Sequence, residues 1–293
     1  MQNTDAYDYA MERRLGQLDP DLHRRFADGV FALQYNLSNY KLIFPEYTDH
    51  TNLHSLTVID FCNHLIGDQI SRLNADELYV LLMGCYFHDA GMGITMNDFR
   101  EFSKQINFRD YFDTHDGGDV PAVIRDFHNE FSGCFIRKYA ELFEIPSLAH
   151  QKAIIQVSRG HRKTDLMDEN EYPRALPMPN GNSVCLPYLA ALIRLADEID
   201  VAASRNPVLL YDIETLTDEI EIIENKKVKA VRSMKISEKE FVLFVDGSDA
   251  EILGHIRRMV TKMQKTLDLC RMAVLQRTPY VITQERVRME VIN

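Results

Sequence analysis

Apolar residues recur at helical spacing through most of the first 205 residues of this 293-residue chain. Three such faces are formed by Leu53, Leu56, Val58, Phe61, Cys62 and Leu65, by Val123, Ile124, Phe127, Phe131 and Phe135, and by Ile154, Ile155 and Val157. Because residues three and four apart lie on one side of a helix, each segment predicts an amphipathic helix. Helices of this kind bury their apolar sides against one another, so we expect a helical bundle.

The pattern changes after Asn206. The stretches 228–236 (VKAVRSMKI) and 240–247 (EFVLFVDG) alternate like strands on either side of a short turn, and a further strand is expected within 280–292. A long amphipathic helix is expected over 249–276. We therefore predict a mainly α protein with a helical domain over 1–205 and a small α+β appendage over 206–293. Residues 106–121 and 165–185 carry turn residues and are expected to be long loops.

Composition limits the class of protein. With 45% hydrophobic residues the chain can bury a large core, and its formal net charge of −11 disfavours broad nucleic-acid binding, which needs a basic surface. The apolar runs are too short for a transmembrane helix, and the acidic, polar first residues do not resemble a signal peptide. The five scattered cysteines are typical of reduced core residues, so we expect a cytoplasmic protein with no membrane partner.

Several polar side chains are predicted to point into this apolar core. His54 shares a face with Val58, His128 with Phe131, and Asp197 with Ile193. The remaining members of this inward set are His161, which ends a helix, and the adjacent pair His88 and Asp89, which ends an apolar run. One buried histidine is ordinary, but a buried carboxylate without a partner is costly. A single metal centre would satisfy the whole set.

The order of these residues resembles the HD-domain family of metal-dependent phosphohydrolases. His54 in "HSLTV" matches the first histidine of the family, "FHDAG" supplies the doublet His88 and Asp89, and "RLADEID" makes Asp197 the last ligand. His128 in "HNEFSG" and His161 in "SRGH" stand where binuclear members place additional histidines. The resemblance covers about residues 45–205 and implies an HD-type helical bundle.

The resemblance also implies a ligand set and a reaction. His54, His88, Asp89 and Asp197 would hold one divalent ion. His128 and His161 would hold a second, with Asp89 bridging the two ions. The expected catalytic residues are Asp89, His128 and His161. Imidazole and carboxylate ligands suit Mn, Fe, Ni, Mg or Zn. His50 is an alternative to His54, and Met92 stands where many hydrolytic members carry a lysine.

A phosphorylated substrate also needs cationic side chains. Arg162 and Lys163 follow His161, Arg194 lies one turn before Asp197, and Arg205 follows the last helix of the body, so these four are the expected substrate-binding residues. The alternatives are an ion pair for Arg194 and a solvated helix end for Arg162 and Lys163. The basic run Lys226, Lys227, Lys229 and Arg232 is interpreted as a solvated strand face.

These features favour metal-dependent hydrolysis of a phosphate ester, with a nucleotide as substrate and a metal-activated water as nucleophile. Two alternatives stay open. One is an HD-type nuclease, which the acidic charge disfavours. The other is a nucleotide-sensing regulatory module, since a helical body with an α+β tail looks somewhat like modules of bacterial conflict systems. A homodimer is a possible assembly, with the methionine-rich C-terminal helix as packing or dimer surface.

Overall fold

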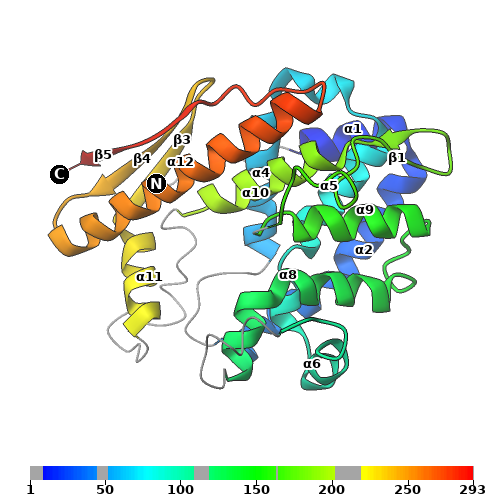
Figure 1. Cartoon of the computed structure of the whole chain (residues 1–293), viewed down its shortest axis with the longest axis horizontal. Coiled ribbons are helices and arrows are strands. Elements are labelled where there is room, and N and C mark those ends of the chain that lie inside the picture. The colour runs from blue at the N-terminus through cyan, green and yellow to red at the C-terminus, as the bar shows by residue number, and fades with distance from the viewer. Residues whose placement is uncertain (1–8, 45–51, 109–118, 163, 202–218, 293) are drawn as a thin grey trace.

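The computed structural model describes residues 9–44, 52–108, 119–162, 164–201 and 219–292 (Figure 1). Its helical body contains α1 (Ala10–Leu18), α2 (Pro20–Ser38), α3 (Tyr40–Ile43), α4 (Asn52–Ile66), η1 (Gly67–Arg72), α5 (Ala75–Phe87), η2 (Ala90–Gly93), α6 (Met96–Phe102), α8 (Val120–Tyr139), α9 (Leu148–Arg159) and α10 (Leu186–Ile199). The predicted class, mainly α with a small α+β region at the C-terminal end, is confirmed.

Helix α5 is the centre of the body. It begins with a capping box, in which Asn74 accepts a hydrogen bond from the backbone of Glu77 and the Glu77 carboxylate accepts one from the backbone of Asn74. Every residue from Asp76 to Phe87 is buried, and α5 packs against α1, α2, α4, α9 and α10. A helix that is apolar on all sides belongs inside a bundle. The end of α5, where His88 and Asp89 follow, therefore lies deep in the body.

The turn after α5 approaches α8 very closely. A Cβ atom on Gly91 would lie 2.2 Å from the backbone oxygen of His128, so this position in η2 requires glycine. Ser132 of α8 joins both sides of the contact, because its hydroxyl donates to the backbone oxygen of His88 (2.7 Å) and accepts from the backbone N–H of Gly91 (2.8 Å). The first glycine after the His–Asp pair thus allows α8 to reach the end of α5.

The C-terminal region contains α11 (Glu219–Ala230), β3 (Val231–Ile236), β4 (Glu240–Asp246), α12 (Ala250–Arg277) and β5 (Arg286–Ile292). The three strands form a sheet in the order β3-β4-β5, antiparallel between β3 and β4 and parallel between β4 and β5. Helix α12, orange in Figure 1, packs against α10 of the body and against β5. The predicted boundary between residues 205 and 206 lies outside the described residues.

The strand predicted over 228–236 was wrong in its first three residues, because β3 begins at Val231. Residues 228–230 belong to α11, so Lys226, Lys227 and Lys229 stand on a helix and only Arg232 on a strand. Three of the buried positions of α11, residues 221, 225 and 228, have helical spacing. The helix has acidic residues in its first turn and lysines in its last, an arrangement that complements the helix dipole.

The segment from 164 to 185 is fixed on the body. The buried carboxylate of Asp76 accepts hydrogen bonds from Asn180 (2.9 Å) and Asn182 (2.7 Å) and contacts Nε2 of His150 (2.8 Å). The segment also pairs with itself through β1 (Leu176–Pro177) and β2 (Ser183–Val184). A segment with buried anchors of this kind is not expected to open and close over a ligand. Most of the other predicted loop, residues 109–118, lies outside the described residues.

The five cysteines are free and buried, as the sequence predicts. Within the described ranges, no helix is both long enough and apolar enough to cross a membrane.

The Asp76 contacts predict an effect on stability. Burial by itself raises the pKa of Asp76, but the hydrogen bonds from His150, Asn182 and Asn180 lower it to about 2. A carboxyl whose pKa falls on folding stabilises the fold above its unfolded pKa, and this contribution disappears as the pH falls from about 4 towards 2. Asp76→Ala should lower the free energy of unfolding by about 3 kcal/mol at pH 7. Urea unfolding checks this, with the exposed Asp68→Ala as control. Equal stability of the two variants would contradict it.

Candidate metal centre

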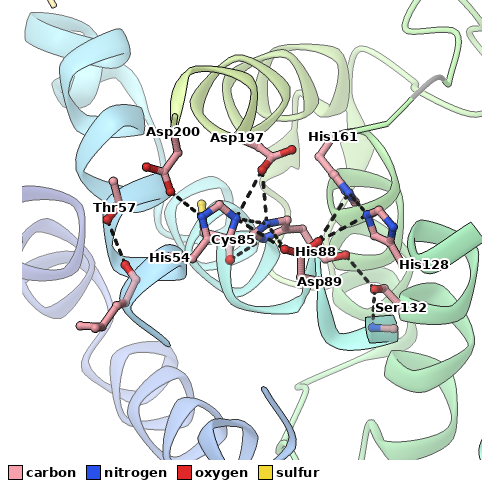
Figure 2. A network of polar contacts seen from close by, with 12 residues as sticks. His54, Thr57, Cys85, His88, Asp89, His128, Ser132, His161, Asp197 and Asp200 are labelled. Carbon is pink, nitrogen blue, oxygen red and sulfur yellow. Dashed lines mark hydrogen bonds and ion pairs between the residues drawn. The ribbon is translucent and has the colours of Figure 1, made fainter. Parts of the chain in front are cut away.

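Three helices bring the first group of predicted ligands together (Figure 2). His54 lies in the first turn of α4, His88 and Asp89 at the end of α5, and Asp197 in the last turn of α10. Nε2 of His54 lies 3.0 Å from Nε2 of His88 and 3.3 Å from Oδ1 of Asp197. Nε2 of His88 lies 3.2 Å from Oδ2 of Asp89. Residues that are far apart in the chain thus present their ligand atoms to one point.

A second group lies on the other side of Asp89. Nε2 of His128 from α8 is 2.7 Å from Nε2 of His161, which follows α9. Oδ1 of Asp89 is 3.4 Å from Nε2 of His128 and 3.9 Å from Nε2 of His161. The two oxygens of one buried carboxylate therefore face two separate histidine pairs. His54, His88 and Asp89 form one group that could hold a metal ion, and Asp89, His128 and His161 form another.

The tautomers of three histidines follow from their hydrogen bonds. Nδ1 of His88 contacts the backbone oxygen of Cys85 (2.8 Å), Nδ1 of His128 that of Arg125 (2.7 Å), and Nδ1 of His161 that of Ser158 (2.5 Å). A carbonyl oxygen can only accept, so each Nδ1 carries the proton and each neutral ring has its lone pair on Nε2. In the His128–His161 contact two such lone pairs point at each other. A cation between them removes the repulsion, and the residues therefore fit a metal ion.

The local structure explains these contacts. His88 caps the end of α5, and His161 follows the end of α9, so the carbonyl three residues earlier lies in the last turn of its helix, where carbonyls lack the usual i+4 donor. His128 lies inside α8, but Phe127 has φ −116° and ψ 15°, which interrupts the helix directly before it. Each ring thus contacts a carbonyl at a helix end or next to an irregular helical residue.

Asp200 is a site residue that the sequence reasoning missed. Its Oδ2 lies 2.6 Å from Nδ1 of His54, and both side chains are buried. Asp200 thus orients the His54 ring and directs its Nε2 to the candidate metal centre, as the backbone carbonyls do for His88, His128 and His161. The available signal was its position one helical turn after Asp197 in "ADEID".

Burial and neighbouring charges shift the pKa values of three site histidines in different directions. Burial lowers the pKa of His128, and burial together with the rings of His128 and His88 holds the pKa of His161 well below its usual range. Both rings are therefore neutral near pH 7, as metal ligands must be. Burial also lowers the pKa of His88, but Asp89 and Asp197 outweigh it and raise that pKa to about 9. A cation bound there would compete with this proton.

The predicted cationic residues have different surroundings. Arg162 is half-buried and lines the cavity beside His161. Arg194 donates to the backbone oxygens of Gly160 (2.6 Å) and Thr164 (2.9 Å), so it braces the turn that carries His161. Lys163, Arg205 and the alternative ligand His50 lie outside the described residues.

A cavity of about 770 Å³ opens beside the ligands. Asp89, His128, His161 and Asp197 line one side, together with Met92 and Arg162. The other side is formed by α11 and α12, including Lys227, Arg258 and Lys262. The C-terminal region is therefore part of the wall of the site, which the sequence did not predict.

The position of Asp89 predicts the metal content. The purified protein should approach about two divalent ions per chain at saturation, and Asp89→Ala should lose both because it removes the shared ligand. The His128→Ala/His161→Ala double variant should retain about one ion. Elemental analysis by mass spectrometry checks both values. Wild-type metal content in Asp89→Ala would contradict the site, and wild-type content in the double variant would make those histidines ordinary core residues.

Asp200 should affect metal affinity without being a ligand. Asp200→Ala is expected to weaken binding by about 10- to 100-fold, the usual effect of removing a carboxylate that orients a metal-binding histidine. Competition with a chelator of known affinity measures this. Asp126→Ala, which removes an exposed carboxylate of nearby α8, is the matched control. If both variants bind metal equally well, Asp200 does not orient His54.

Comparison with known proteins places the chain in a family. A family model described as HD-CE matches residues 44–278, which include every proposed ligand and the whole of α12. Searches of curated proteins and of solved structures give no match. The expected HD-type domain is confirmed by this match and by the histidine–aspartate cluster. Because the match covers most of its length, the chain belongs to the HD-CE family.

Proposed function

We propose that this protein is a metal-dependent hydrolase of a phosphate ester, and that its substrate is a nucleotide. The observation that carries the proposal is the position of Asp89, whose two oxygens face two histidine pairs. Asp89 and the pair His128 and His161 line one cavity. Two adjacent cation positions joined by a carboxylate are suited to holding and polarising a phosphoryl group.

The proposed ligands would hold two divalent ions. His54, His88, Asp89 and Asp197 would hold one divalent ion, and Asp89, His128 and His161 a second. Such ions neutralise charge on a phosphoryl oxygen and lower the pKa of a bound water. The chain itself keeps the imidazoles of His128 and His161 neutral by burial, and it orients the four rings through the backbone carbonyls and Asp200.

Arg162 supports a phosphorylated substrate. Its side chain lines the cavity next to His161, and within the part of the chain that the structure describes no acidic side chain forms an ion pair with it. An arginine can bind a phosphate through two parallel hydrogen bonds. The cavity volume of about 770 Å³ also lies within the range of small-ligand sites, which suits a nucleotide better than a long nucleic acid.

The test is an assay in which Mn, Mg, Ni, Fe or Zn is supplied in turn with mononucleotides, dinucleotides, cyclic nucleotides and single-stranded DNA. We expect metal-dependent phosphate-ester hydrolysis of at least one nucleotide. Arg162→Ala should lower kcat/KM by about 10- to 100-fold with unchanged metal content, because a hydrogen bond from a charged donor contributes about 1.5–3 kcal/mol. The exposed Arg174→Ala is the control.

The same panel separates the alternatives. Turnover of DNA alone would replace the proposal with a nuclease. Tight nucleotide binding with no turnover under any metal would replace it with a nucleotide-sensing module. An Arg162→Ala variant with wild-type kcat/KM would remove Arg162 from the substrate site.

A further inference from the structure

Helix α12 has two different long faces. Its apolar face is buried against the rest of the protein and consists of Ile252, Ile256, Met263, Leu267, Cys270 and Val274. A second face lines the cavity that contains the proposed metal ligands, with His255, Arg258, Met259, Lys262, Thr266 and Leu269. Apart from the adjacent Arg258 and Met259, successive positions are separated by three or four residues, so they form one stripe along the helix. Met259 also packs against the hydrophobic core, whereas Arg258, Lys262 and Leu269 are exposed and line the cavity.

Lys262, one residue of this stripe, forms an ion pair with α10. Its Nζ is 2.9 Å from Oε1 of Glu198, and Glu198 directly follows the proposed ligand Asp197 in α10. The ion pair therefore joins α12 to the metal-facing end of α10. Arg258 stands four residues earlier on α12, about one turn or 5–6 Å along the helix. Arg258 lines the same cavity as Lys262.

Arg258 is available for a ligand. Over the described ranges, no hydrogen bond or ion pair occupies its guanidinium, whereas Lys262 pairs with Glu198 and Lys227 pairs with Glu224 at 2.5 Å. Met259, half-buried beside it on the stripe, gives the wall apolar surface. Arg258 is itself exposed, as Arg257 is, so what distinguishes Arg258 is that it lines the cavity. This cationic stripe also occurs in a chain whose formal net charge is −11, so it is not a product of a generally basic surface.

We propose that the α12 stripe is a second anion subsite, which binds a phosphate group of the substrate other than the one held at the metal centre. Arg258 is its main residue, with Lys262 as its neighbour. The inference rests on the proposed function and narrows its substrate to a nucleotide with a second phosphate group, either in a diphosphate chain or on another position of the sugar. The C-terminal region then determines specificity, while the helical body provides the ligands for the metal.

The experiment compares Arg258→Ala with Arg257→Ala. Arg257 is the adjacent arginine of the same helix, is exposed, and does not line the cavity, so the two variants remove the same charge and side chain. Calorimetry on the full chain, both metal-loaded and after EDTA treatment, measures binding of AMP, ADP and adenosine 3′,5′-bisphosphate. Steady-state KM for the same nucleotides is measured on the metal-loaded protein. Melting temperatures verify that both variants fold.

Arg258→Ala should weaken binding of ADP, of the bisphosphate, or of both by about tenfold or more, while AMP changes by less than about threefold. The diphosphate and the bisphosphate distinguish the two positions of the second phosphate. Arg257→Ala should leave all three affinities within about twofold of wild type. Equal affinities in the two variants, an equal loss for AMP and the doubly phosphorylated probes, or no binding of either doubly phosphorylated probe by the wild type would overturn the subsite. The binding measurement does not require turnover, so an inactive protein that shows the expected pattern would contradict the hydrolase and leave the subsite standing.

Discussion

Buried histidine nitrogens that face one another and a shared carboxylate form a group that could hold a metal ion, and this group lies at the centre of the molecule. The Nε2 atoms of His128 and His161 lie 2.7 Å apart, while the other nitrogen of each ring contacts a backbone oxygen. The arrangement depends on rigid supports. The end of α5 lies in the middle of the bundle, and Gly91 allows α8 to approach it. Precise placement of buried imidazoles thus follows from helix ends held by packing.

The site also joins the two parts of the chain. Helices of the body carry the proposed ligands, and α12 contributes the facing wall of the cavity. The ion pair between Lys262 and Glu198 and the packing of α12 on α10 keep that wall in place. The C-terminal region that the sequence predicted as an appendage therefore forms part of the cavity wall, and the HD-CE family match likewise extends through α12.

Sequence periodicity predicted much of the fold because burial repeats with the geometry of a helix. The helices of the body, the turn at Ser237 and the long C-terminal helix were all expected, and the structure describes them. The start of β3 was misplaced by three residues, because valine and alternating lysines suit a strand as well as the end of a helix. Residues 165–185 were expected to be a long loop, and no local pattern in the sequence predicted the hydrogen bonds from this segment to Asp76.

The sequence by itself determined which side chains turn inward, and hence His54, His88, Asp89, His128, His161 and Asp197 as a candidate ligand set. It could do so because the side of a helix on which a residue lies depends only on spacing. The tertiary structure alone decided that Asp89 faces both histidine pairs, that Asp200 orients His54, and that Arg258 lines the cavity. These relations join segments more than 30 residues apart, and their geometry depends on how helices pack, which no local pattern specifies.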